Sequence, residues 1–337
     1  MTKRWLVACP LLVALPFGAQ AQSSVTLYGI VDAAVALEDT GEPGRGSRKV
    51  LNSGNQSSSR LGFRGSEDLG AGLKAVFNLE SGVSLDTGAA DSAFFGRRAV
   101  VGLEGGFGAL MLGREYAPIA AVAGAADIMG QGFFGTNLGA FASNRLTRRL
   151  SNSVTYVTPR FNGLRASIAA SPSEGASGAT RVLGSAVEFN AGRLYAGGGY
   201  HDVERLNGLK DKEYALGFGY GIGDVDVKGN YLVADPSGAG NKFEQFNIGA
   251  SIGLGKGRLF GNVQSNRLEG GAKGTALAAT YSYELSRRTN VYASYARLSN
   301  NASGRFGLNS SSTSVTPAAS APGADPSVMA LGVRHRF

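Results

Sequence analysis

Residues 277–285 read Leu-Ala-Ala-Thr-Tyr-Ser-Tyr-Glu-Leu, so apolar side chains alternate with small or polar ones. Successive side chains of a β-strand point to opposite faces, and a period of two therefore predicts a strand with one apolar face. The same period recurs over 73–80, 214–220 and 246–254. Long stripes with the helical period of 3.6 residues do not follow the N-terminal region. The chain is predicted to be all-β.

The N-terminal region has a different composition. Two basic residues precede an apolar run over 5–17, and the small-x-small pattern Ala-Gln-Ala follows at 19–21. This order is typical of a secretory signal peptide, which we expect to span residues 1–21. Residues 6–9 also resemble a lipoprotein lipobox, but only four apolar residues precede Cys9 and the apolar run continues past it. Cleavage after Ala21 is the favoured interpretation.

The remaining residues, 22–337, are predicted to form one domain. They contain no cysteine, which excludes disulfides, thiol chemistry and cysteine-based metal sites. The 51 glycines among 337 residues are about twice the usual share. The mean hydropathy is −0.04, and no apolar run approaches the ~20 residues of a membrane-spanning helix. Tyrosine and phenylalanine recur throughout, which argues against disorder.

Alternation alone fits either a soluble β-sandwich with its apolar face inward or a wide membrane barrel with its apolar face outward. The predicted export signal and the regular spacing of turns favour the barrel. Seven short glycine-rich or polar turns alternate with eight long polar loops, which predicts 16 antiparallel strands with both termini at the short-turn end. The expected long loops lie near 38–59, 82–93, 115–148, 171–180, 201–212, 235–242, 266–273 and 299–326.

Five stretches together resemble the general porins of the Gram-negative outer membrane, most closely the betaproteobacterial type. The resemblance covers essentially all of 22–337. The stretches are SVTLYGIVD (24–32), SRLGFRGSEDLG (59–70), VGLEGGFG with LGR (101–108 and 112–114), NSVTY (152–156) and GVRHRF (332–337).

This resemblance implies a 16-stranded antiparallel transmembrane β-barrel in the cell outer membrane, with a long third loop folded into the lumen. It further implies a homotrimer in contact with outer-membrane lipid and lipopolysaccharide, and a C-terminal Phe337 that serves as an assembly signal. No cofactor or metal is expected, because nothing in the sequence demands one; a cation bound between loop carboxylates remains open from the sequence. Its expected activity is passive diffusion of small hydrophilic solutes and ions.

Such a pore selects solutes through fixed charges at its constriction. Where Leu61 and Phe63 face lipid, Arg60 and Arg64 must point inward, and the same parity argument applies to the arginines at 98 and 149. The resemblance places these strands opposite the third loop. The predicted constriction residues are Arg60, Arg64, Arg98, Arg114, Glu115, Asp127 and Arg149.

The third loop should run from about Glu115 to Arg148 and contains few acids. The excess of positive charge predicts a preference for small anions. Alternatively, some of these arginines serve only to bind loop backbone or neighbouring carboxylates. Both interpretations remain open from the sequence.

Other functions fit less well. A hydrolase needs a base beside a nucleophile, but neither histidine, His201 or His335, has a convincing serine or aspartate partner, so no enzyme is expected. The pI of 9.6 suggests nucleic acid, yet the basic residues are scattered and the chain carries an export signal, so no nucleic-acid partner is expected. A structural adhesin is a weaker interpretation. A substrate-specific channel on the same barrel needs a line of lumenal aromatic residues; only Tyr28 and Phe260 are candidates.

Overall fold

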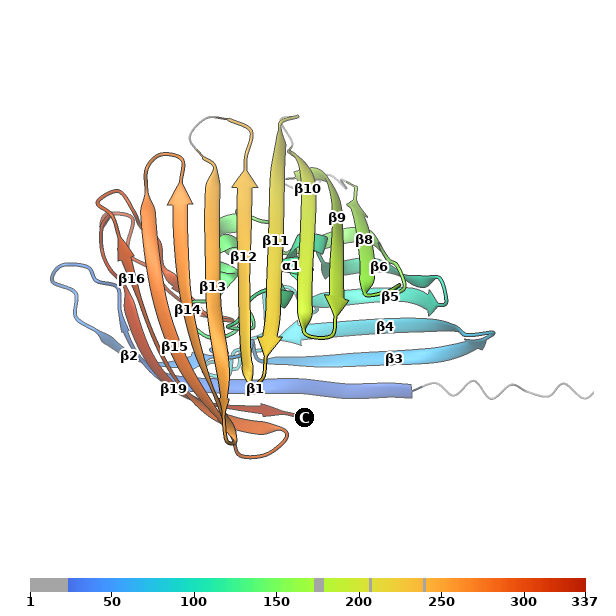
Figure 1. Ribbon diagram of the computed structural model, residues 1–337, viewed down its shortest axis with the longest axis horizontal. Helices are drawn as coiled ribbons and strands as arrows, with labels where there is room; N and C mark the ends of the chain where they lie inside the picture. The colour runs from blue at the N-terminus through green and yellow to red at the C-terminus, as the bar shows by residue number, and fades with distance from the viewer. Residues whose placement is uncertain (1–23, 173–178, 206–207, 239–240) are drawn as a thin grey trace, which may run out of the picture.

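The computed structural model describes residues 24–172, 179–205, 208–238 and 241–337. The predicted signal peptide and its cleavage site lie outside the described residues. Strands make up most of the described chain (Figure 1). No described helix is long and apolar enough to cross a membrane.

The first half contains β1 (Ser24–Asp39), β2 (Arg48–Ser53), β3 (Arg60–Gly70), β4 (Leu73–Gly82), β5 (Arg98–Gly105), β6 (Gly108–Tyr116), α1 (Pro118–Ala125), the 3₁₀ helices η1 (Asn137–Ala140) and η2 (Ala142–Asn144), β7 (Arg149–Val157) and β8 (Leu164–Ser171). The second half contains β9 (Ala179–Ala191), β10 (Leu194–Arg205), β11 (Lys210–Ile222), β12 (Val225–Asp235), β13 (Phe243–Leu254), β14 (Gly257–Leu268), β15 (Lys273–Glu284), β16 (Thr289–Asn300), β17 (Leu308–Asn309), β18 (Ser314–Val315) and β19 (Ser327–Arg336).

The sheet closes on itself. Each barrel strand pairs antiparallel with its neighbour, and β19 pairs with both β16 and β1. β2 and β3 both pair with β1, so they are two parts of one interrupted barrel strand. The result is a 16-stranded antiparallel barrel, as the turn count predicted. In Figure 1, β10–β13 run nearly upright and β3–β5 nearly horizontal, as expected where two walls of tilted strands cross.

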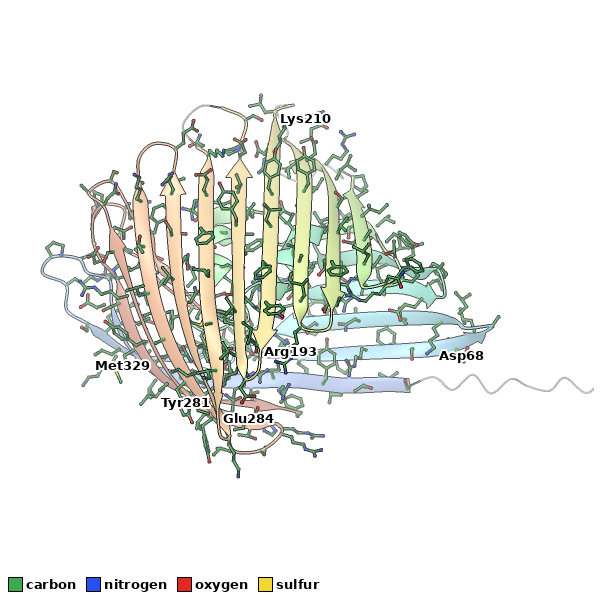
Figure 2. All side chains as sticks on the ribbon, in the orientation of Figure 1. Asp68, Arg193, Lys210, Tyr281, Glu284 and Met329 are labelled. Atoms are coloured by element: carbon green, nitrogen blue, oxygen red, sulfur yellow. The ribbon has the colours of Figure 1, made fainter. Side chains whose placement is uncertain are left out.

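The apolar face of each strand points outward. Leu277 is 59% exposed, whereas the next inward residue, Ala278, is 8% exposed. Tyr281 and Met329, labelled in Figure 2, belong to the same outer set of exposed apolar side chains. The interior instead buries polar side chains such as Gln245 and Asn262. This arrangement is the reverse of a soluble sandwich and matches a barrel surrounded by lipid.

Short turns gather at one end of the barrel and long loops at the other, and the C-terminus lies at the turn end (Figure 1). Two expected loops need correction. The loop expected near 201–212 is shorter, because β10 extends to Arg205 and β11 begins at Lys210. The predicted first loop, 38–59, contains strand β2, which pairs with β1 from Ala33 to Glu38. With only two apolar residues in its six, Val50 and Leu51, this strand shows too little alternation to stand out in the sequence.

The third loop, residues 117–148, folds into the lumen as predicted. Its helix α1 starts with Pro118 at the first turn, where a missing N–H costs nothing, and it packs against β8 to β11. Ile119 and Val122 are fully buried in this contact. Glycine on the facing strands makes the contact close: a Cβ on Gly217 would lie 2.7 Å from Cβ of Ala126. Part of the glycine excess thus gives the loop room inside the barrel.

Candidate functional site: the lumen beside the third loop

Asp127 organises the interior of the third loop. Its carboxylate accepts hydrogen bonds from the backbone N–H groups of Met129 (3.1 Å), Gln131 (2.9 Å) and Asn137 (3.4 Å), and from the Thr136 hydroxyl. Burial raises the pKa of Asp127, and these four donors oppose that rise. The side chain is only 1% exposed. The structure therefore places Asp127 inside the folded loop, not on the water-filled lumen where the sequence analysis expected it.

A buried His–Glu pair fastens both ends of the loop to the wall. Nδ1 of His201 lies 2.9 Å from Oε2 of Glu213. Nε2 of His201 accepts the N–H of Ile119, at the start of α1, at 3.4 Å. Glu213 accepts the N–H of Thr147 at 3.0 Å and its hydroxyl at 2.8 Å, at the other end of the loop. Since Thr147 directly precedes Arg148, this pair also fixes where the arginines at the loop end begin.

Amide side chains from the wall support the middle of the loop. Nδ2 of Asn230 donates to the carbonyl of Ala126 at 3.0 Å, and Nδ2 of Asn262 donates to the carbonyl of Gly135 at 2.7 Å. These bonds give hydrogen-bond donors to backbone carbonyls in the middle of the loop. The loop is thus seated along its whole length.

The interruption between β2 and β3 narrows the lumen from another side. The six residues 54–59 stand opposite only Val31 and Asp32 of β1, so they bulge out of the strand ladder. The carboxylate of Asp32 accepts the N–H groups of Gln56 (2.8 Å) and Ser57 (2.6 Å). A Cβ on Gly132 of the third loop would lie 2.1 Å from the Gln56 carbonyl oxygen. The loop tip therefore packs directly onto this segment.

Arginines collect on the wall that faces the loop. Nε of Arg97 lies 2.7 Å from Oε1 of Glu80, and Nε of Arg60 lies 3.4 Å from Oε2 of the same carboxylate. Arg97 also donates to the hydroxyl of Tyr116 at 3.4 Å. Two cations therefore share one acid, which leaves this group with an excess of positive charge.

A second group surrounds Tyr116. Arg149 donates to its hydroxyl at 2.8 Å and stacks 4.5 Å from the ring centroid, while Arg148 lies 6.0 Å from it. Arg98 forms a tight ion pair with Glu115. Burial lowers the pKa of Arg148 to about 10, which still leaves it charged at neutral pH. These contacts hold the guanidinium groups in fixed positions.

The two groups together form what we call the arginine cluster. It has five guanidinium groups and two carboxylates: Arg60, Arg97, Arg98, Arg148, Arg149, Glu80 and Glu115. Open space lies beside it: a cavity of about 290 Å³ is lined by Arg98, Glu115 and Tyr116 as well as by residues of α1. The cluster borders this cavity through Arg98 and Glu115.

Two predicted residues lie apart from the cluster. Arg64 points inward, with its guanidinium 5.3 Å from the ring of Tyr28, and lines an adjoining cavity of about 290 Å³. Arg114 pairs across the sheet with Ala99, on the outward parity shared by Leu112. Its guanidinium bonds the carbonyl of Gly96 at 2.6 Å. The structure thus brings Arg60, Arg98, Glu115 and Arg149 together but not Arg64, Arg114 or Asp127.

The sequence analysis missed several participants. Arg97 precedes β5, so the alternation along that strand does not give the direction of its side chain. Glu80 of β4 was not among the predicted constriction residues. His201 was considered only as a possible catalytic base; its partner Glu213 lies on the next strand. A polar residue pair on adjacent inward positions of β10 and β11 is the signal that points to such a contact. Nδ1 of the other histidine, His335, lies 2.8 Å from the Thr289 hydroxyl, and His335 belongs neither to the His–Glu pair nor to the arginine cluster.

Comparison with known proteins identifies the family. The sequence profile described as "Gram-negative porin" matches residues 8–303. Outer membrane porin protein 32 of Delftia acidovorans is 32% identical, over 99% of this chain and all of the relative. The anion-selective porin from Comamonas acidovorans superposes with a TM-score of 0.85 at 30% identity, covering 94% of this chain and 100% of that one. The trimer form of OmpT from Vibrio cholerae shares the fold, with a TM-score of 0.69 at 18% identity, over 94% and 99% of the two chains. The chain therefore belongs to the Gram-negative porin family and is a β-barrel porin of the outer membrane.

Proposed function

We propose that this porin passes small hydrophilic solutes by diffusion and prefers anions. The observation that supports the preference is the arginine cluster, in which five guanidinium groups are accompanied by only two carboxylates and Arg98 lines the open cavity beside α1. Fixed positive charge in a water-filled passage with low-dielectric walls raises the local concentration of anions and repels cations. The third loop, 117–148, adds no opposing acid to the lumen, because the carboxylate of Asp127 is buried within the loop itself.

A related protein supports the same proposal. The solved structure that covers the whole barrel at 30% identity is described as an anion-selective porin. The property belongs to that protein, and the arginine cluster is the reason for extending it to this chain.

Reversal potentials measured in planar bilayers under a KCl gradient test the proposal. We expect a potential of the sign that chloride preference gives, with the preference weakening as salt rises, because screening shortens the reach of the fixed charges. A potential of the sign that potassium preference gives, at low and high salt alike, would sink the anion proposal while leaving the porin fold untouched.

The structure gives little support to a substrate-specific channel. The hydroxyl of Tyr28 lies 3.0 Å from a side-chain oxygen of Asn78 and 3.0 Å from one of Glu80. The ring centroid of Phe260 lies 5.6 Å from that of Phe133. Both aromatic candidates are used in packing. We likewise propose no catalysis: His201 is fully buried, so its imidazole is closed to substrate.

We further propose that the barrel is a homotrimer embedded in outer-membrane lipid and lipopolysaccharide. Its exposed apolar belt and its shared fold with a porin solved in trimer form support this assembly. Light scattering of the detergent-solubilised protein, corrected for bound detergent, should give three chains per particle, and a single chain would contradict it.

Phe337 is proposed as the assembly signal. Its backbone closes the barrel seam with Gly29 through two hydrogen bonds of 3.1 Å, yet its side chain stays 46% exposed. Because F337A keeps the backbone bonds, it should lower the yield of assembled barrel in cells more than the stability of protein refolded in detergent.

A further inference from the structure

The turn end of the lumen holds a second basic cavity, separate from the arginine cluster. Its volume is about 360 Å³. We propose that this cavity, called here the mouth site, binds small polyvalent oxyanions such as pyrophosphate. Its basic lining residues are Lys256, Arg258, Arg287, Arg288, Arg334 and Arg336.

Three elements of the barrel bring these side chains together. Arg287 and Arg288 come from the turn between β15 and β16, and Lys256 from the neighbouring turn between β13 and β14. Arg336 of β19 donates its backbone N–H to the carbonyl of Arg288 at 2.9 Å and its guanidinium to the carbonyl of Arg287 at 3.0 Å. Figure 2 shows Glu284, at the end of β15, at the same end of the barrel. The clustering is thus a consequence of barrel closure.

The cavity wall reaches up into the lumen. Arg334 donates Nε to the hydroxyl of Ser57 at 2.8 Å, and Gln56 and Asn290, which are hydrogen-bonded to each other at 2.7 Å, also line the cavity. Because the third loop packs on Gln56, the mouth site lies just beyond the narrowed region of the lumen.

Positive charge in the mouth site is poorly balanced. Arg258 pairs with Asp226. Among the described residues, Lys256 and the four other arginines form no ion pair within 4.0 Å. Glu284 is the one acid in the lining, and no ion pair joins it to these cations. An oxygen of the terminal carboxylate accepts the Gly29 N–H instead.

Cations gathered within one cavity repel each other, and the repulsion is reduced when an anion enters. Guanidinium groups offer planar pairs of donors that match phosphate and carboxylate oxygens, and an ammonium adds a point charge. A polyvalent oxyanion contacts several of these donors at once, whereas chloride contacts few. The site should therefore favour polyvalent over monovalent anions.

Calorimetric titration with pyrophosphate tests the site on the assembled protein in detergent at low salt. We expect saturable binding to the wild type and roughly ten-fold weaker binding to R287Q/R288Q, which corresponds to about 1.4 kcal/mol. The matched control is R160Q/R193Q. These two arginines lie at other short turns, each bonded to a glycine carbonyl, at 2.7 Å from Gly163 and 2.6 Å from Gly223, and neither lines the cavity. The control should bind pyrophosphate as the wild type does.

Single-channel recording supplies a second readout. Pyrophosphate should reduce the chloride current of the wild type at lower concentration from one side of the membrane than from the other, and R287Q/R288Q should lose that asymmetry. Equal binding and equal block in the wild type, R287Q/R288Q and R160Q/R193Q would overturn the mouth site.

The proposal shares with the anion preference only the idea that anions use the lumen. A porin that prefers potassium but still shows the arginine-dependent pyrophosphate binding would refute the selectivity proposal alone. A porin that prefers chloride but binds pyrophosphate equally in both double variants would refute the mouth site alone. Circular dichroism of each variant confirms that the barrel is intact.

Discussion

The imidazole of His201 and the carboxylate of Glu213 are joined at 2.9 Å in a place that water does not reach, 0% and 1% exposed respectively. Through this one contact, β10 and β11 hold residue 119 at the start of the third loop and residue 147 at its end. The positions of Arg148 and Arg149, which directly follow Thr147, therefore depend on a pair that is itself fully buried.

E213Q tests this dependence. The amide nitrogen of glutamine faces donors from Thr147 and His201, so at least one buried hydrogen bond is lost, at a cost of about 1–3 kcal/mol. We expect a lower melting temperature of the barrel and greater noise in the open-channel current, because the loop end is released. The matched control is E244Q. The carboxylate of Glu244 accepts a hydrogen bond from the Tyr231 hydroxyl at 2.7 Å, and this contact does not involve the third loop. Quiet channels in E213Q would show that the loop is held by its other contacts.

Charge changes within the arginine cluster should act with opposite signs. A unit charge about 8 Å from the ion path changes an ion's energy by about 0.5 kcal/mol at the permittivity of water. R149Q is therefore expected to lower the chloride-to-potassium permeability ratio roughly two- to five-fold, and E80Q to raise it by a similar factor. Reversal potentials measure both. A shift in the same direction for both variants would mean that geometry, not charge, governs the ratio.

Asp127 should affect stability but not selectivity. In D127N an amide group replaces an oxygen that accepts buried donors, so the loop interior is weakened by about 1–3 kcal/mol. Thermal unfolding should report the loss, while the reversal potential should stay close to that of the wild type. A change in the permeability ratio as large as that of R149Q would show that the Asp127 charge is felt in the lumen.

Arg114 provides a test of position. Because it lies on the outward parity of β6, R114Q should leave the permeability ratio within experimental scatter, whereas R98Q should lower it. If R114Q and R98Q lowered the ratio equally, the placement of Arg114 outside the lumen would be contradicted in solution.

The sequence predicted the barrel well because strand parity and turn spacing are local properties. Alternation over 277–285 predicted which side chains are exposed, and the same parity turned Arg60 and Arg98 inward. Arg114 was included as an addition to the positive side of the constriction, without a parity argument, although alternation from Leu112 points it outward. Parity remains the better guide wherever a residue lies within a regular strand.

Contacts between distant segments were out of reach. Nothing local distinguishes Asp127 as the centre of a hydrogen-bonded loop from Asp127 as a charge on the lumen, since its donors depend on how the loop folds back on itself. Arg97 shares Glu80 with Arg60 only because β3, β4 and β5 are adjacent. Charge balance in the pore therefore emerges from strand order.

The break between β2 and β3 gives the two sides of the narrowed lumen unequal freedom. Residues 54–59 continue into barrel strands at both ends and are held by the Asp32 carboxylate. The third loop, 117–148, is much longer between its strands, and it is held by hydrogen bonds and by the apolar packing of α1, contacts that can be changed one at a time. Thermal fluctuations in the width of the narrowed lumen should therefore come mainly from movement of the third loop. Changes designed to alter that width should be made in the third loop, with residues 54–59 left unchanged as the rigid side.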